Sequence, residues 1–213
     1  MVRGTLSRVT TPDFKADLLR YLQEARNSIV WKLDGLSEYD ARRPMTPTGT
    51  NILGLVKHLA SVEIGYFGDV FGRPFGEELP WLVDVDVESF ATMSPDVLVA
   101  DLWATADESR EQIVGLYRRV WAHSDATIEA FELDATVQVP WWSKSSEVTL
   151  HRLLVHMTAE THRHAGHVDI ARELIDKVAG LSDGNTNLPT DDPAWWESYY
   201  AKLERVAREA DQR

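Results

Sequence analysis

Five of the seven histidines in this 213-residue chain fall between positions 151 and 167, in the segment HRLLVHMTAETHRHAGH. Apolar residues recur there in steps of three and four, which predicts a helix. Followed from its apolar ends, the stripe runs through Leu150, Leu153, Met157, Glu160, His164, His167, Ala171 and Leu174. Glu160, His164 and His167 are therefore predicted to face a core. His151 and His162 are predicted to point to solvent.

An ionised carboxylate in a core is costly unless something compensates its charge. Glu160 and His164 are one helical turn apart, so their side chains can converge on a divalent metal ion. A third ligand must come from a facing helix, and His58, in LGLVKHLAS, is the best candidate. Neutral imidazole and carboxylate suit zinc, with nickel or iron as alternatives, and three protein ligands leave coordination positions open. His167 could replace Glu160 as a ligand, support a ligand or act as a base, and His156 could hydrogen-bond Glu160.

A plainer interpretation competes with the metal site. A single buried histidine is more often a hydrogen-bonded core residue than a ligand, and His58 alone favours that interpretation. Two histidines and a glutamate on one face favour a metal. The alternatives to an enzyme are a non-catalytic metal-binding bundle and a purely structural bundle whose histidines are satisfied by hydrogen bonds.

Other side chains could line a binding site. Trp141 and Trp142 precede the histidine-rich helix and could lie at the mouth of a pocket, although packing over a bundle end is an equal alternative. Arg163 could bind a polar thiol or its carboxylate, with a solvated salt bridge as the preferred alternative. A second aromatic group could wall a pocket, but its helical spacing favours core packing: Trp195, Trp196, Tyr199 and Tyr200.

Composition limits the classes of function. Hydrophobic residues make up 44% of the chain, enough for the core of a single domain spanning residues 1–213. The net charge of −12 makes nucleic acid and anionic membranes poor partners. The chain has no cysteine, so any thiol chemistry needs an external thiol. The N-terminal segment lacks the apolar run of a signal peptide, so we expect a cytoplasmic protein; a homodimer stays open.

Helical periodicity dominates the rest of the chain. We expect helices that begin near residues 11–12, 51, 94–95, 149 and 191–193 and end near residues 33, 71, 123, 178 and 206. A two-stranded hairpin could form within residues 124–146. The predicted fold is an all-α four-helix bundle with long crossover connections and an extra C-terminal helix.

Two segments, TGTNILGLVKHLASVEIGYF and HMTAETHRHAGHVDIARELID, resemble the DinB/YfiT-like superfamily. The resemblance is to the branch of uncharacterised DinB-like proteins, related to mycothiol-dependent transferases and maleylpyruvate isomerase. It implies a four-helix bundle that holds a divalent metal, with His58, Glu160 and His164 as ligands. Many members have histidine where Glu160 stands, whereas maleylpyruvate isomerase relatives have glutamate. His167 matches a frequent histidine outside the ligand set.

The resemblance also implies a function. We expect a metal-dependent S-transferase that uses a low-molecular-weight thiol, mycothiol in an actinobacterium, on an electrophilic small molecule. In that enzyme His167 is the candidate catalytic acid or base, and Trp141, Trp142 and Arg163 are candidates for binding the thiol. The alternative is a non-catalytic metal-binding bundle of the stress-associated or ligand-sensing kind.

Overall fold

The computed structural model describes residues 13–83, 87–142 and 147–212. The chain divides into two compact units, Met1–Ala179 and Gly180–Arg213. The prediction of one domain over residues 1–213 stays a prediction.

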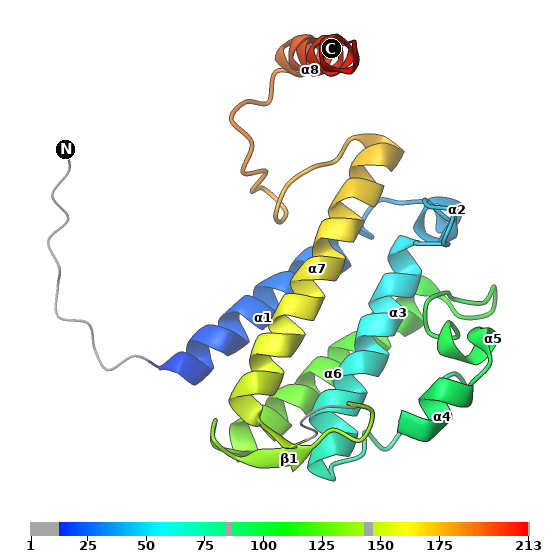
Figure 1. Ribbon diagram of the computed structural model, residues 1–213, viewed down its shortest axis with the longest axis vertical. Coiled ribbons are helices and arrows are strands. Elements are labelled where there is room, and N and C mark those ends of the chain that lie inside the picture. The colour runs from blue at the N-terminus through cyan, green and yellow to red at the C-terminus, as the bar shows by residue number, and fades with distance from the viewer. Residues whose placement is uncertain (1–12, 84–86, 143–146, 213) are drawn as a thin grey trace, which may run out of the picture. The chain divides into compact units, whose positions relative to one another are not determined.

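Four long helices form the first unit: α1 (Phe14–Trp31), α3 (Ile52–Glu63), α6 (Arg110–Ala130) and α7 (Leu150–Asp176) (Figure 1). Helix α7 packs against α1 and α3, and α3 packs against α6. Each helix begins where a side chain accepts a hydrogen bond from a free backbone N–H of the first turn; these caps are Asp13, Asn51, Ser109 and Thr149. The arrangement confirms the predicted all-α four-helix bundle.

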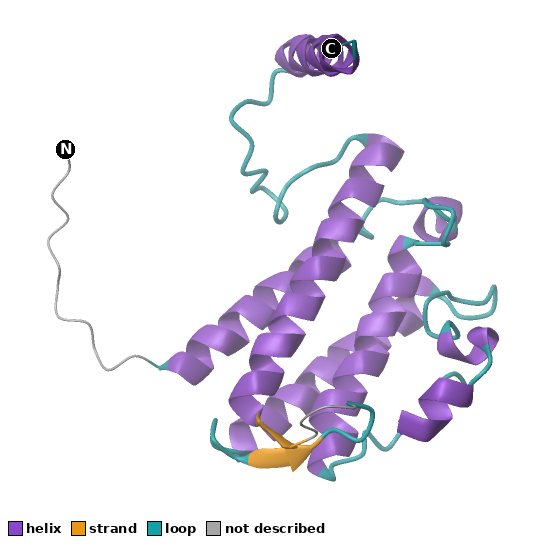
Figure 2. Ribbon diagram, in the orientation of Figure 1, coloured by secondary structure: helices purple, strands orange, loops and turns teal. Residues whose placement is uncertain are grey.

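Shorter elements connect the four helices. Helix α2 (Glu38–Arg42) follows α1, and α3 continues into a π-helix, η1 (Ile64–Gly68), and a 3₁₀ turn, η2 (Asp69–Phe71). The crossover before α6 carries α4 (Val87–Thr92) and α5 (Pro95–Leu98). Strands β1 (Thr136–Gln138) and β2 (Glu147–Thr149) pair in an antiparallel hairpin at one end of the bundle (Figure 2). A hairpin was therefore a correct prediction, although its second strand lies beyond residue 146.

The predicted third helix, from Ser94–Pro95 to about residue 123, is wrong. Helix α5 ends at Leu98. Helix α6 begins at Arg110, where Ser109 and Gln112 form a capping box. Between them, backbone carbonyls are satisfied by side chains from other elements instead of by a helical ladder.

Helix α3 supplies several of those partners to the crossover. The Asn51 side chain donates to the Leu102 carbonyl (3.0 Å), and Lys57 Nζ donates to the carbonyl of residue 103 (3.1 Å). A Cβ at Gly54 would lie 1.9 Å from the Leu102 carbonyl oxygen. Only glycine lets the crossover approach α3 this closely, which brings the crossover alongside His58, one turn further along the helix.

The buried face of α7 differs from the predicted stripe in its second half. Thr161, Ala165 and Val168 are buried there. Glu160 and His164 lie beside this row and are partly exposed, and His167 is exposed, as is Leu174. The predicted core-facing position is therefore wrong for His167. The predicted row and the observed row both have spacings of three and four residues. Thr161 and Ala165 are small, so they allow close packing but add little hydrophobicity by which the sequence could mark their row as buried.

The predictions for the outer face of α7 hold. His151 and His162 are both exposed.

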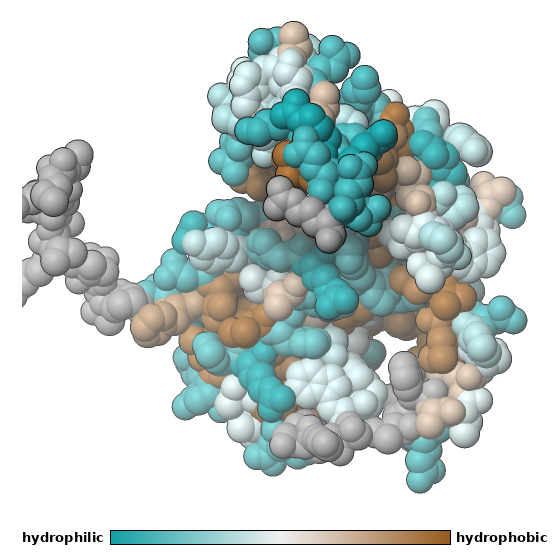
Figure 3. Space-filling view, turned by 45° about the horizontal axis from the view of Figure 1, so that its top comes forward, coloured by the Kyte–Doolittle hydropathy of each residue, from teal (hydrophilic) through white to brown (hydrophobic). Residues whose placement is uncertain are grey.

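Over the surface shown in Figure 3, polar residues cover much of the area and apolar residues form separate patches. Among the described residues, no helix has the length and apolar character needed to cross a membrane.

The second unit contains α8 (Pro193–Asp211), which Asp192 caps. The rings of Trp195 and Tyr199 stack 5.0 Å apart on one side of this helix. Within this unit no residue of α8 is buried, so the predicted core packing of its aromatic residues stays a prediction.

Candidate metal centre

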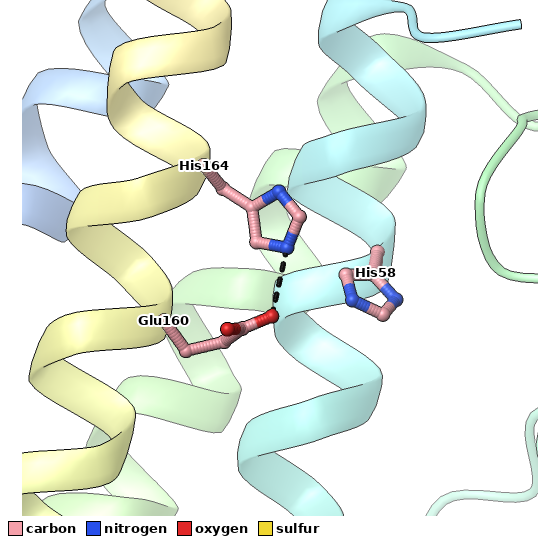
Figure 4. Close-up of side chains that lie close together, drawn as sticks. All are labelled: His58, Glu160 and His164. Carbon is pink, nitrogen blue, oxygen red and sulfur yellow. Dashed lines mark hydrogen bonds and ion pairs between the residues drawn. The ribbon is translucent and has the colours of Figure 1, made fainter. Parts of the chain in front are cut away.

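Three of the predicted site residues meet between two helices. His58 projects from α3, and Glu160 and His164 project from α7 toward it (Figure 4). One ligand atom from each residue lies within 4.8 Å of the other two. His164 Nε2 is 3.0 Å from Glu160 Oε1, and the two imidazole rings are 5.1 Å apart between centroids. We call these three residues the His/Glu/His cluster.

Helix geometry explains the cluster. A spacing of four residues places Glu160 and His164 on one side of α7, and the packing of α7 against α3 brings them opposite His58. The cluster is partly buried: the side chains are 22%, 31% and 13% exposed for His58, Glu160 and His164. It therefore lies at the edge of the bundle core, where a small molecule can reach it.

Asp101 holds the second nitrogen of one candidate ligand. His58 Nδ1 is 2.9 Å from Asp101 Oδ2, and Figure 4 shows the other ring nitrogen facing Glu160 and His164. With the proton on Nδ1, the ring donates to Asp101 and keeps the lone pair of Nε2 for a metal, as metal-bound histidines commonly do. Sequence reasoning missed Asp101, because nothing local links the crossover to α3.

The environment of His164 fits a neutral ligand. Burial lowers the pKa of His164 below its ordinary value, and the neighbouring ring of His58 lowers it further. Its Nδ1 is buried and has no hydrogen-bond partner among the described residues. One carboxylate with two neutral imidazoles is a donor set for zinc, nickel or iron, and a spread of 4.8 Å needs only a small closure around one ion. His58, Glu160 and His164 therefore fit a divalent metal.

A cavity of about 710 Å³ opens beside the cluster, with His58 and Glu160 among its lining residues. This volume is within the range of sites for small organic ligands. Trp141 lies in the cavity wall, and Trp142 does not. Both indole N–H groups donate to the hydroxyl of Tyr66, at 3.2 and 2.8 Å, so the tryptophan pair fixes that ring in the wall.

His156 faces the same cavity, one turn before Glu160. Its ring packs edge-on against Tyr66 and Trp142, with centroids 5.0 Å apart in each case. Burial lowers the pKa of His156, so the ring is neutral at pH 7 and able to accept a proton. From the sequence, this histidine was considered only as a hydrogen-bond partner of Glu160.

The other predicted site residues lie farther out. His167 is exposed, with its ring 5.4 Å from that of His164, and Arg163 is exposed on α7. Neither is among the described residues that line the cavity. Asp169, two residues after His167, forms an ion pair with Lys32 at 2.8 Å. The roles predicted for His167 and Arg163 stay predictions.

Comparisons with known proteins agree with this architecture. A family model described as mycothiol-S-transferase matches residues 17–177, which contain the whole His/Glu/His cluster. Among solved structures, YfiT from Bacillus subtilis superposes with a TM-score of 0.54 and 15% sequence identity, covering 81% of this chain and 93% of that one. YfiT is described as a probable metal-dependent hydrolase with an unusual four-helix bundle topology, and at this identity the likeness shows a shared fold. A comparison with curated proteins gave no match. The family match confirms the resemblance seen in the sequence: the chain belongs to the mycothiol S-transferase family.

Proposed function

We propose that this protein is a metal-dependent S-transferase that joins a low-molecular-weight thiol, mycothiol, to an electrophilic small molecule. The observation that carries the proposal is the convergence of His58, Glu160 and His164 beside a cavity large enough for a small organic ligand. The family match supports the choice of thiol. A zinc ion and a cytoplasmic location are parts of the same proposal.

The chemistry needs an activated sulfur atom, and the chain has no cysteine to supply one. A divalent metal, when bound, supplies Lewis acidity that lowers the pKa of a thiol. His58, Glu160 and His164 would hold this metal, and Asp101 would orient the ring of His58. The thiol proton passes to a ring nitrogen of His156. A sulfur lone pair then forms the C–S bond, and the leaving group departs with its bonding electrons; in an addition, His156 returns the proton to the product.

Two histidines are candidates for the proton acceptor. His156 faces the cavity and has a pKa lowered by burial, so it is available as a base at neutral pH. His167 is the candidate from the sequence and the family resemblance, and its ring packs edge-on against that of His164. We place His156 first because a general base must reach the reacting proton.

Cobalt substitution tests the proposal directly. The full chain, loaded with Co²⁺, is titrated with mycothiol, bacillithiol, glutathione and coenzyme A, and its absorption spectrum is recorded. We expect a sulfur-to-metal charge-transfer band with mycothiol and no such band with an oxygen analogue. Thioether formation with a panel of electrophiles, followed by mass spectrometry, then identifies the reaction.

The alternatives give different results. A chain that binds cobalt but shows no thiol-dependent band and consumes no thiol is a non-catalytic metal-binding bundle. A chain that cleaves esters or amides without thiol has the kind of activity described for YfiT. Either result would overturn the transferase proposal.

A further inference from the structure

The walls of the cavity are mainly apolar and aromatic. They are contributed by α3 and η1, by the loop that follows η2, by α5 and by the segment after β1. Representative residues are Val62, Ile64, Phe75, Trp81, Leu98 and Trp141. Such walls favour a ligand that transfers apolar surface out of water, at roughly 25 cal/mol for each Å² buried. The bulk of the ligand is therefore expected to be hydrocarbon or aromatic.

The charged groups of the cavity carry one sign. Four carboxylates line it, from Asp69, Glu77, Asp101 and Glu160, and no lysine or arginine is among the described lining residues. A hydrogen bond from Arg119 holds the pKa of Glu77 below its ordinary value, so this carboxylate stays ionised at neutral pH. The cavity therefore offers a negative field to a ligand.

Two cations beside the lining, Arg119 and Lys57, are already engaged. Both carboxylate oxygens of Glu77 accept from Arg119, at 2.7 and 2.8 Å. Lys57 pairs with Glu108 at 2.9 Å, and its Nζ lies 3.9 Å from the centroid of the Trp81 ring. A ligand carboxylate would lose its hydration without gaining a lysine or arginine partner among the described lining residues, which is unfavourable. With a divalent cation on the His/Glu/His cluster, one positive charge remains, and a single deprotonated thiol neutralises it.

We propose that the electrophile is an uncharged, apolar or aromatic small molecule, and that the cavity rejects organic anions. That the ligand is an electrophile rests on the proposed function. The charge preference rests on the lining residues alone. The full chain freed of metal by a chelator therefore tests it by binding, without any thiol, because no metal charge is then left to attract an anion.

The probes are N-phenyl-1-naphthylamine, which is uncharged, and 1-anilinonaphthalene-8-sulfonate, which adds a sulfonate to the same aromatic skeleton. Both fluoresce in apolar surroundings, so titration gives their dissociation constants. We expect the uncharged probe to bind tighter by about tenfold or more, because the sulfonate finds no lysine or arginine among the described lining residues. Equal or tighter binding of the sulfonate overturns the proposal.

Bulky substitutions locate the bound probe. Val62→Trp and Leu98→Trp fill the cavity from two different elements, and each is expected to weaken the uncharged probe by about tenfold. Val155→Trp is the matched control, because Val155 is 45% exposed on α7 and outside the lining. Circular dichroism checks that each variant is folded. If both folded cavity variants bind the uncharged probe as the wild type does, the proposal fails.

A charge substitution tests the rejection of anions. Glu77→Gln removes one lining carboxylate and releases Arg119, so the sulfonate probe should bind several-fold tighter while the uncharged probe is unchanged. Glu129→Gln, at an exposed position of α6, is the control and should change neither constant. An unchanged sulfonate constant in Glu77→Gln counts against the proposal. If the chain binds the uncharged probe selectively but gives no cobalt–thiol band, the proposed charge preference stands and the proposed transferase function fails.

Discussion

His58 is the residue that separates a metal centre from a structural cluster of histidines. After His58→Ala, the two candidate ligands that remain in the cluster come from one turn of α7, and two ligands hold a divalent ion weakly. We expect the purified, tag-free variant to lose most of its metal, measured by inductively coupled plasma mass spectrometry. His162→Ala is the control, because His162 is exposed on the opposite side and should keep full metal content. Full occupancy in His58→Ala would show that the ligand set is wrong.

Asp101 should act on the metal through His58. Its carboxylate lies 2.9 Å from Nδ1 of His58, so it favours the tautomer with the proton on Nδ1 and leaves Nε2 as the metal donor. Asp101→Asn keeps the size but removes the charge, so metal affinity should fall by about 10- to 100-fold. Competition with a chelating dye measures it. Asp107→Asn, at an exposed position of the same crossover, should leave the affinity unchanged; a parallel loss there would mean that the crossover is merely disturbed.

The two candidate bases can be separated by the pH dependence of thioether formation. His156 must be neutral to accept a proton, and burial lowers its pKa from 6.5. The rate should therefore hold as pH falls to 6.5 and decline only below it. His156→Gln should lower kcat/KM by about 10²- to 10⁴-fold and remove that decline. His167→Gln should change little, and the opposite pattern would assign the base to His167.

At the scale of single residues, the sequence predicts the candidate ligands better than their surroundings. Glu160 and His164 are predictable because a spacing of four residues brings two side chains together on any helix. His58 follows from its place beside an apolar stripe that must face a partner. Asp101 is not predictable, because its position depends on an irregular crossover held against α3. His156 is visible in the sequence, but only the fold shows that a cavity lies in front of it.

Among the elements, a buried charge network joins α1, α3 and α6. Arg26 donates through Nε and Nη2 to the two oxygens of Glu63, at 2.9 and 2.5 Å, and through Nη1 to Asp125 at 2.8 Å. The Tyr117 hydroxyl also donates to Glu63, at 3.1 Å. The Arg26 and Glu63 side chains are 1% and 0% exposed, so neither charge has water as an alternative partner.

Glu63→Gln should destabilise the protein strongly, because it leaves the Arg26 guanidinium buried without its main counter-charge. We expect a loss of about 3–5 kcal/mol in the free energy of unfolding, measured by urea denaturation. Glu24→Gln breaks an exposed pair with Arg20 on α1 and should cost about 0.5 kcal/mol or less. Similar losses in the two variants would mean that the network contributes no more than a surface pair.

The misplaced third helix shows why elements are harder to predict than single sites. Ser94 and Pro95 do begin a helix, and the apolar spacing continues beyond it, but the chain leaves the helix at α5. The reason is non-local: Asn51, which caps α3, and Lys57, on α3, supply hydrogen bonds that a helical ladder would have made. The capping box at Ser109 and Gln112 was the one local signal of the true start of α6.

At the scale of the whole molecule, two boundaries nearly coincide. The family match ends at residue 177, and the first compact unit ends at Ala179. The His/Glu/His cluster, the lining residues described for the cavity and the buried charge network all lie within that unit. Gly180–Arg213 contributes none of the described groups to which a function has been assigned.

A chain that ends at Ala179 should therefore keep the metal centre. We expect the same metal stoichiometry as in the full chain and a cooperative thermal unfolding transition, because every ligand and each of the four bundle helices remains. The same truncation carrying His58→Ala should lose the metal, which shows that the retained ion occupies the proposed site. A folded, monodisperse truncation that binds no metal would mean that residues 180–213 are needed for the site. The prediction of one domain spanning the whole chain would then be the better description.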